Sequence, residues 1–164
     1  YYIADGRSFV SNFQEDSVIT ETQKLYTAAI GMTEFIPNQV KLFADGAMFS
    51  QLMQMSDGYL DGHHGEWLMD PEVFEIAFRI YWDAGFQIHV HQNGDAGLDM
   101  VLDNLEANMV RTPRIDHRTV IVHFGFSRPD QVERIAKLGA IVSANPFYPI
   151  ILAKHIRQTY KAHI

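Results

Sequence analysis

The sequence predicts an α/β fold in which parallel strands alternate with helices, equivalent to about half of an eight-stranded barrel. Four short runs, at residues 40–43, 86–91, 119–123 and 140–144, have the length of strands, and residues 86–90 and 120–122 are rich in the residue types of buried strands. Three segments between these runs have apolar residues at helical spacing, so strands and helices alternate along the chain. A complete (β/α)8 barrel needs about 250 residues, so 164 residues suffice for a partial TIM barrel only.

The first part of the chain is less regular. We expect residues 1–38 to form an irregular lead-in with one short helix over 21–30, which Thr20 would cap and Gly31 would end. The strand at 40–43 carries Lys41 in its middle. A loop over 45–69 follows, and a loop of that length is typical of a functional segment.

Three helices follow with clear start or stop signals. Asp70 and Pro71 are typical of an N-cap and a first helical position, so a helix should run from there to Ala84 and stop at Gly85. A second helix is predicted over 96–109 and a third over 129–138. We expect residues 147–164 to be a loop and helix tail of the same single domain, 1–164.

Composition narrows the function. Hydrophobic residues make up 47% of the chain, enough for a core, and the net charge of -7 argues against a general binder of nucleic acid or anionic membranes. Without cysteine, a metal would need histidine, carboxylate or modified lysine ligands. No apolar run reaches the roughly 18 residues of a membrane span. The compartment stays open, with the cytoplasm favoured, and a start at Tyr1 suggests an internal boundary.

Three candidate ligands lie on three successive strands. Lys41 lies within the first, His91 ends the second, and His123 ends the third. Side chains at the carboxyl ends of parallel strands gather at one edge of the sheet. Neutral imidazoles bind zinc, nickel and iron, and a bound metal activates water and polarises a carbonyl. The pattern therefore favours a metal-dependent hydrolase.

These segments together resemble the amidohydrolase superfamily, in particular amidohydrolase family 3, which includes N-substituted formamide deformylases. The resemblance covers residues 39–146 and rests on four ordered motifs at 40–46, 91–96, 122–123 and 141–146. It implies a (β/α)8 barrel in which these strands are the fourth to the seventh. The chain departs from the family pattern where Gln92 and Asn93 replace Ala-Ile, where no arginine follows Asp95, and where Val122 replaces glutamate.

The resemblance also implies roles. Lys41 takes the position of a bridging lysine carboxylated by CO₂, and His91 and His123 take those of metal ligands. One or two divalent ions, zinc above all, would serve hydrolysis of a small amide, N-acyl or N-formyl substrate. The family's general-base aspartate and its first-strand His-x-His pair would lie outside this chain, so we expect the fragment alone to be inactive.

The roles of several further residues allow more than one interpretation. Asn145 ends a strand and either contacts substrate or forms a polar turn. Asp95 is expected to cap the helix that begins near residue 96. His89 shares a strand face with His91; the pair could be the first-strand His-x-His, but we favour a structural role for His89 behind His91. His63, His64 and Glu66 could form a surface metal site, although solvated loop residues are the simpler interpretation.

Two other functions remain open. The chain could be a non-catalytic half-barrel module for assembly, or a barrel enzyme in which the amine of Lys41 forms a Schiff base. Since an open parallel sheet exposes its edge strands, we also expect a homo-oligomer, most simply a dimer.

Overall fold

A computed structural model describes residues 2–12, 14–28, 31–152 and 158. Five strands form one sheet in which every neighbouring pair is parallel and the spatial order β1-β2-β3-β4-β5 follows the chain. The strands are β1 (Tyr2–Asp5), β2 (Phe35–Phe43), β3 (Gln87–Gln92), β4 (Val120–His123) and β5 (Ile141–Ala144).

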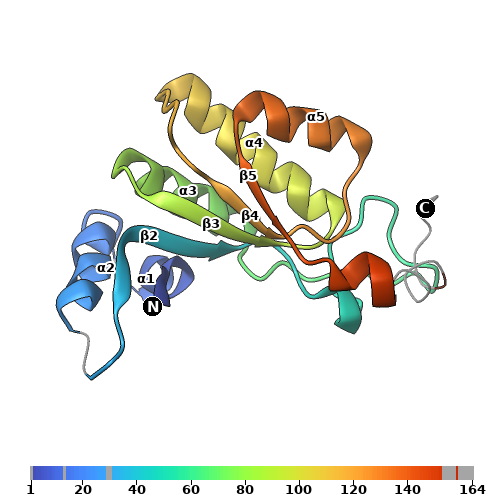
Figure 1. The fold of residues 1–164 in the computed structure, drawn as a ribbon, viewed down its shortest axis with the longest axis horizontal. Helices are drawn as coiled ribbons and strands as arrows, with labels where there is room; N and C mark the ends of the chain where they lie inside the picture. The colour runs from blue at the N-terminus through green and yellow to red at the C-terminus, as the bar shows by residue number, and fades with distance from the viewer. Residues whose placement is uncertain (1, 13, 29–30, 153–157, 159–164) are drawn as a thin grey trace.

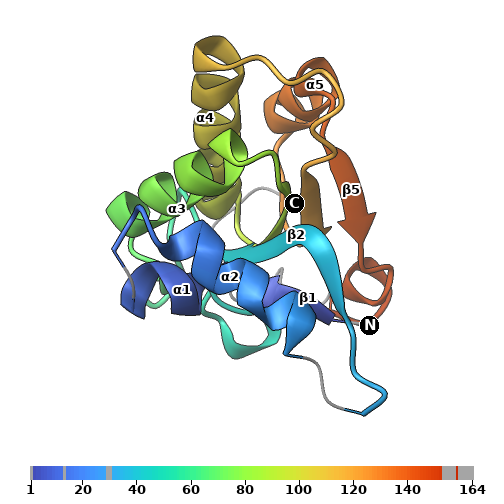
Figure 2. The same cartoon turned by 90° about the vertical axis from the view of Figure 1, so that its left-hand side faces the viewer.

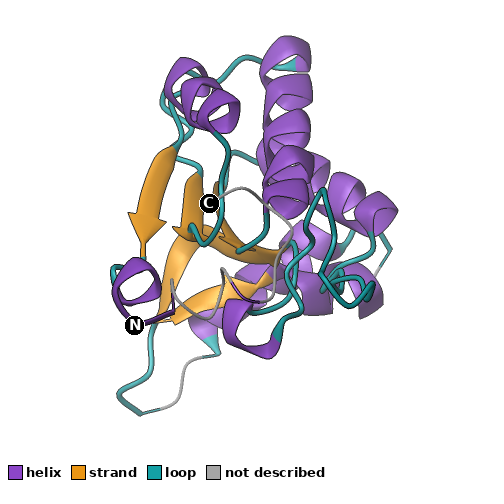
Figure 3. Ribbon diagram, turned by 90° about the vertical axis from the view of Figure 1, so that its right-hand side faces the viewer, coloured by secondary structure: helices purple, strands orange, loops and turns teal. Residues whose placement is uncertain are grey.

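The helices cover the outer face of this sheet in chain order (Figures 1 and 2). They are α1 (Gly6–Asn12), α2 (Val18–Thr27), α3 (Pro71–Asp83), α4 (Asp95–Arg111) and α5 (Pro129–Leu138). Figure 3 shows the strands as a curved layer with α3, α4 and α5 on one side. A sequential parallel order with helices on one face is the arrangement of part of a (β/α)8 barrel, whereas an open doubly wound sheet reverses its strand order. The predicted fold class is thereby confirmed.

The core lies between sheet and helices because alternate strand residues point to it. Val40 and Leu42 of β2 and Ile88 and Val90 of β3 are fully buried there. They pack against one apolar face of each of α3, α4 and α5, which contribute Phe74, Phe78, Tyr81, Leu98, Val101, Leu105 and Ile135. The intervening residues of the same strands, among them Lys41 and His91, consequently point to the opposite, inner face.

The lead-in differs from its prediction. Residues 1–38 contain β1, α1, α2 and the first four residues of β2 rather than one helix. Helix α2 begins after Ser17 rather than after Thr20. The side chain of Thr22 explains this position, since its hydroxyl lies 2.8 Å from the Tyr81 hydroxyl of α3 and docks α2 there. A long-range contact therefore overrides the local capping pattern. Ile30 and most of the predicted tail lie outside the described residues.

The long loop after β2 is confirmed and folds over the carboxyl ends of the strands (Figure 1). It contains one 3-10 turn, η1 (Met48–Ser50), and a bridge between Asp45 and Trp67. The segment after β5 forms a π-helical turn, η2 (Tyr148–Leu152), on the same side. No helix within the described ranges is long and apolar enough to cross a membrane.

Candidate metal centre

The strand register places Lys41 beside the two histidines of β3. In the parallel pairing of β2 with β3, Lys41 lies opposite His89 and Phe43 lies opposite His91. Paired residues point to the same side of a sheet, so all four side chains share the inner face. The rings of Phe43 and His91 are 5.9 Å apart between centroids.

His123 reaches His91 through an unusual backbone conformation. Its register partner on β3 is Gln92, which is fully buried on the helix side. His123 has φ 75° and the following Phe124 has φ 49°, both in the left-handed region that non-glycine residues rarely adopt. The rings of His91 and His123 meet edge to face with centroids 4.5 Å apart. Backbone strain of this kind concentrates at functional sites.

Burial disfavours the protonated form of each of these groups. It lowers the pKa of Lys41 to about 8. It also lowers the pKa of His91 to about 4, assisted by the positive charges of His123 and Lys41 and opposed by the Asp45 backbone. Burial, and then the charge of Lys41, lowers the pKa values of His89 and His123 as well. At neutral pH the imidazoles are therefore uncharged, the form that coordinates metals.

Asp45 holds the turn that carries His91, a role that sequence reasoning missed. Its fully buried carboxylate accepts hydrogen bonds from the backbone N–H groups of Asn93 (2.9 Å), Gly94 (2.7 Å) and Gln54 (2.9 Å). Burial raises the pKa of Asp45 to about 6, against the lowering effect of these donors. The sequence signal was an aspartate-glycine pair directly after a strand, but its partners lie far along the chain.

Asn93 was also missed, and it contacts His91 directly. Its amide nitrogen lies 3.0 Å from Nε2 of His91 and donates to the carbonyl of Gly46 at 3.1 Å. Asn93 is fully buried. Within the part of the chain that the structure describes, its Oδ1 and the Nε2 of His89 are buried without a hydrogen-bond partner. The inner face thus holds polar atoms whose bonding is incomplete.

Asp95 differs from its predicted role as a helix cap. Helix α4 begins at Asp95 itself, with Gly94 as N-cap. The carboxylate of Asp95 accepts the backbone N–H of Ser56 at 2.9 Å and pairs with the guanidinium of Arg128 at 2.9 Å. The predicted structural role is retained, but it consists of fastening the long loop and the start of α5 to the His91 turn.

Asn145 follows β5, and its backbone N–H donates to the carbonyl of His123 at 3.1 Å. Its side-chain oxygen accepts the N–H of Phe147 at 3.1 Å, which closes a polar turn. A substrate contact for Asn145 stays a prediction. His89 lies opposite Lys41 and one pair away from His91 toward the start of β3, as expected for a residue behind the ligands.

The residues present fit part of a metal centre. Two neutral imidazoles meet at the strand ends, and Lys41 is their common charged neighbour. Among the described residues, no three histidine, aspartate or glutamate side chains form a complete metal-binding group. This applies equally to the alternative at His63, His64 and Glu66. A complete centre therefore needs oxygen donors from a carboxylated Lys41 or from further ligands.

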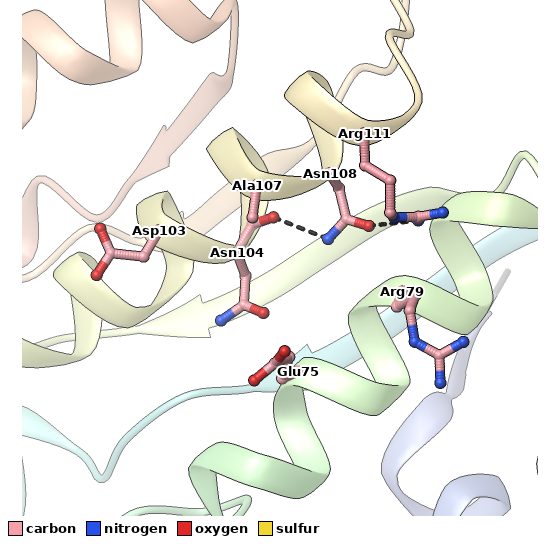
Figure 4. Close-up of a pocket in the computed structure, with 7 residues that line it drawn as sticks. All are labelled: Glu75, Arg79, Asp103, Asn104, Ala107, Asn108 and Arg111. Atoms are coloured by element: carbon pink, nitrogen blue, oxygen red, sulfur yellow. Dashed lines mark hydrogen bonds between the residues drawn. The ribbon is translucent and has the colours of Figure 1, made fainter.

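A surface groove lies away from these strand ends. A groove of about 330 Å³ runs between α3 and α4, lined by Glu75 and Arg79 from one helix and by residues such as Asp103 and Arg111 from the other (Figure 4). Its arginines are engaged, Arg79 with Glu15 and Arg111 with Asp83. The groove lies in the helix layer and contains none of the strand-end residues.

Comparison with known proteins is consistent with this geometry. A profile of the amidohydrolase family matches residues 11–163. Crystal structures of uncharacterized metal-dependent hydrolases from Pyrococcus furiosus and Pyrococcus horikoshii OT3 superpose with TM-scores of 0.67 and 0.68, each at 24% identity. They match 90% and 88% of this chain, which corresponds to 30% and 29% of theirs, and they support the fold.

Curated relatives show a similar pattern. The chain is 29% identical to Protein LONG AFTER FAR-RED 3 of Arabidopsis thaliana over 109 residues, covering 65% of this chain and 19% of that protein. It is 24% identical to the putative amidohydrolase YtcJ of Bacillus subtilis over 111 residues, covering 66% and 20%. The chain therefore spans about a fifth of the length of these relatives.

Proposed function

The chain belongs to the amidohydrolase family, and on that premise we propose that it supplies part of the metal centre of a hydrolase that cleaves carbon–nitrogen bonds in amide, N-acyl or N-formyl compounds. The observation that carries the proposal is the meeting of His91 and His123, with ring centroids 4.5 Å apart, on the face that also holds Lys41. Lys41, His91 and His123 would help to hold a divalent ion, for which we propose zinc; when bound, such an ion would lower the pKa of water and polarise the substrate carbonyl.

The protein residues prepare this site. His91 and His123 present neutral imidazoles, and Asp45 and Asn93 hold the His91 turn in place. Lys41 would add CO₂ through its neutral amine. In that step a bond forms between Nζ and the carbon, one proton leaves the nitrogen, and the resulting carbamate supplies oxygen donors. The lowered pKa of Lys41 supports this reaction because only the neutral amine is nucleophilic.

The same lowered pKa also favours the second candidate, a Schiff-base enzyme in which the Lys41 amine attacks a carbonyl substrate. Borohydride reduction distinguishes the two. Trapping of a carbonyl compound on Lys41, identified by peptide mass spectrometry, would support the Schiff base, whereas the metal hypothesis predicts no adduct.

Hydrolysis is the direct test of the proposed activity. We propose that the 164-residue chain lacks activity alone and that a longer gene product containing it, loaded with zinc, releases amine from a panel of N-formyl and N-acyl amines. His91→Asn and His123→Asn should abolish this release, and His64→Asn, on the exposed part of the loop, should leave it unchanged. A longer product that holds metal but hydrolyses none of the panel would overturn the choice of substrate class.

A further inference from the structure

His63 lies in the long loop that covers the strand ends, and both of its ring nitrogens face acceptor atoms. Nδ1 is 2.6 Å from a carboxylate oxygen of Asp61, and Nε2 is 2.8 Å from the carbonyl oxygen of Gln51. Neither acceptor has a proton to donate. Both contacts are hydrogen bonds only when both ring nitrogens carry protons, that is, when the ring is an imidazolium.

These contacts close the loop on itself. The bond to Gln51 joins two residues that are 12 positions apart. Gln51 adopts φ 58°, a left-handed conformation that is unfavourable for a non-glycine residue. The backbone N–H of His63 also donates to Asp61 at 3.1 Å. His63 therefore fastens the two ends of the segment 51–63.

The fastened segment packs toward the candidate metal centre. The ring of His63 stacks on Tyr59 with centroids 3.9 Å apart, and Tyr59 is 1% exposed with its hydroxyl donating to the carbonyl of Met53. Tyr59 and Met53 belong to a buried cluster with Met48, Met55 and Tyr148. The ring of Tyr148 lies 6.5 Å from that of His123. If the loop loosened at His63, the buried cluster that lies over the strand ends would therefore loosen as well.

We propose that His63 is a proton-operated clasp, which holds the segment 51–63 closed over the strand-end site when protonated and releases it when neutral. A neutral imidazole donates one hydrogen bond only, so its second nitrogen would present a lone pair to an oxygen lone pair. The clasp does not depend on metal binding or on the proposed hydrolysis. It would give the chain a site that is more accessible at higher pH.

The charges around His63 support the direction of this change. The titratable groups that face it among the described residues are Asp61, which is exposed, the phenol of Tyr59, and Asp57 and His64, which line the same small cavity of about 130 Å³. The Gln51 carbonyl and Asp61 raise the pKa of His63, and the contact lowers the pKa of Asp61. The folded-state pKa lies above the unfolded one, so the clasp is complete below about pH 6.5 and is lost as the pH rises through the folded-state pKa.

The test is a titration of the whole chain followed by NMR. We expect His63 to titrate above 6.5. The amide protection factors of Gly58 and Gly62, whose N–H groups donate to carbonyls inside the segment, should fall as the pH passes the pKa of His63; these factors correct for intrinsic base catalysis. The fall should reach up to about tenfold for each unit by which the pKa exceeds 6.5. His63→Gln should give low protection at every pH, and His64→Gln, the neighbouring control, should behave as wild type.

Asp61→Asn provides a second variant that keeps the ring. It should lower the pKa of His63 and move the loss of protection to lower pH by the same interval. Should His63→Gln fail to fold, this variant and the wild-type titration still decide the question. Titration of His63 at or below 6.5, or wild-type protection in His63→Gln, would overturn the clasp.

Discussion

Among single residues, the inner face of the sheet holds basic groups whose pKa values are lowered by burial. His91 is the extreme case, because its pKa falls to about 4 through burial and the nearby charges of His123 and Lys41. Lys41, with a pKa of about 8, is partly deprotonated at mildly alkaline pH. Such shifts are typical of functional sites, where ligands and nucleophiles must be available without a competing proton.

The lowered pKa of His91 predicts a stability that depends on pH. Its folded-state pKa lies below the unfolded value, so the unfolded chain binds more protons between pH 6.5 and 4, and stability falls as the pH is lowered through this window. Asp45, whose pKa is raised to about 6, acts in the opposite direction there. The test is therefore the difference between wild type and His91→Asn in urea unfolding. Wild type should lose stability relative to the variant on acidification; parallel curves would contradict this.

A small change at Asp45 should have a large effect on the free energy of unfolding. In Asp45→Asn, the new side-chain NH₂ group faces a backbone N–H group and cannot accept a hydrogen bond from it. At least one buried hydrogen bond is therefore lost, which should lower the free energy of unfolding by about 2–3 kcal/mol. The exposed Glu133 offers a control, since Glu133→Gln should change stability by less than about 0.5 kcal/mol. Equal effects of the two substitutions in chemical denaturation would refute the anchoring role of Asp45.

The sequence pointed to candidate residues on the strands, and it missed the residues that hold them. The placement of Lys41, His91 and His123 on one face could be expected because parallel strands bring their carboxyl ends to one edge, and their role as metal ligands stays a prediction. Asp45 could not, because its partners Asn93 and Gly94 lie 48 and 49 positions away and a single sequence does not reveal such contacts. For the same reason, Asp95 was assigned to the nearest helix rather than to Arg128.

At the scale of elements, local signals succeeded where they were strong. Asp70 caps α3 by accepting the N–H of Glu72 at 3.0 Å, and α3 ends just before Gly85, whose φ is 79°. Helix α5 has the predicted bounds. The strand β1 was missed because four residues at the start of the chain show no usable periodicity, and it is recognisable only from its pairing with β2.

The turn between β3 and α4 predicts a steric effect at Gly94. A Cβ at this position would lie 2.1 Å from the carbonyl oxygen of Gln54 and 2.8 Å from Oδ2 of Asp45, so the turn or the loop must move. We expect Gly94→Ala to lower the free energy of unfolding by about 2–3 kcal/mol and to shift the His91 ring resonances.

Gly31→Ala separates this effect from simple backbone strain. Gly31 has φ 76° and no atom of the described residues near its missing Cβ, so only the left-handed conformation is penalised, by roughly 1–2 kcal/mol. Its substitution should leave the His91 resonances in place. A Gly94→Ala chain with unshifted His91 signals and wild-type stability would show that the turn tolerates the methyl group.

In the molecule as a whole, the described residues form a curved segment of sheet whose two outermost strands are β1 and β5. The described residues of β5 are all exposed, including Ile141 at 45% and Val142 at 39%. Exposed apolar edge strands favour pairing with another chain. The overall arrangement was predictable from the alternation of strands and helices, whereas whatever covers β5 could not be read from these residues.

The exposed apolar residues of β5 are the basis on which we predict a homo-oligomer. We expect the chain to form dimers in a concentration-dependent manner, and Ile141→Lys to weaken association by placing a charge on the edge. Val132→Lys, on the outer helix α5, is the matched control because Val132 is similarly exposed at 48%. Sedimentation velocity over a range of concentrations measures this, and a monodisperse monomer at every concentration would reject the prediction.

We propose that Lys41, His91 and His123 form part of one metal centre, and elemental analysis by plasma mass spectrometry would show whether they hold metal. A longer gene product that contains this chain would be freed of chelator, soaked in zinc, desalted and analysed beside its variants His91→Asn, His123→Asn, Lys41→Met and the control His64→Asn. We expect about one equivalent or more of zinc in the wild type and the control, and a loss of zinc in the three site variants. Equal zinc content in all five proteins, or none in the wild type, would contradict it.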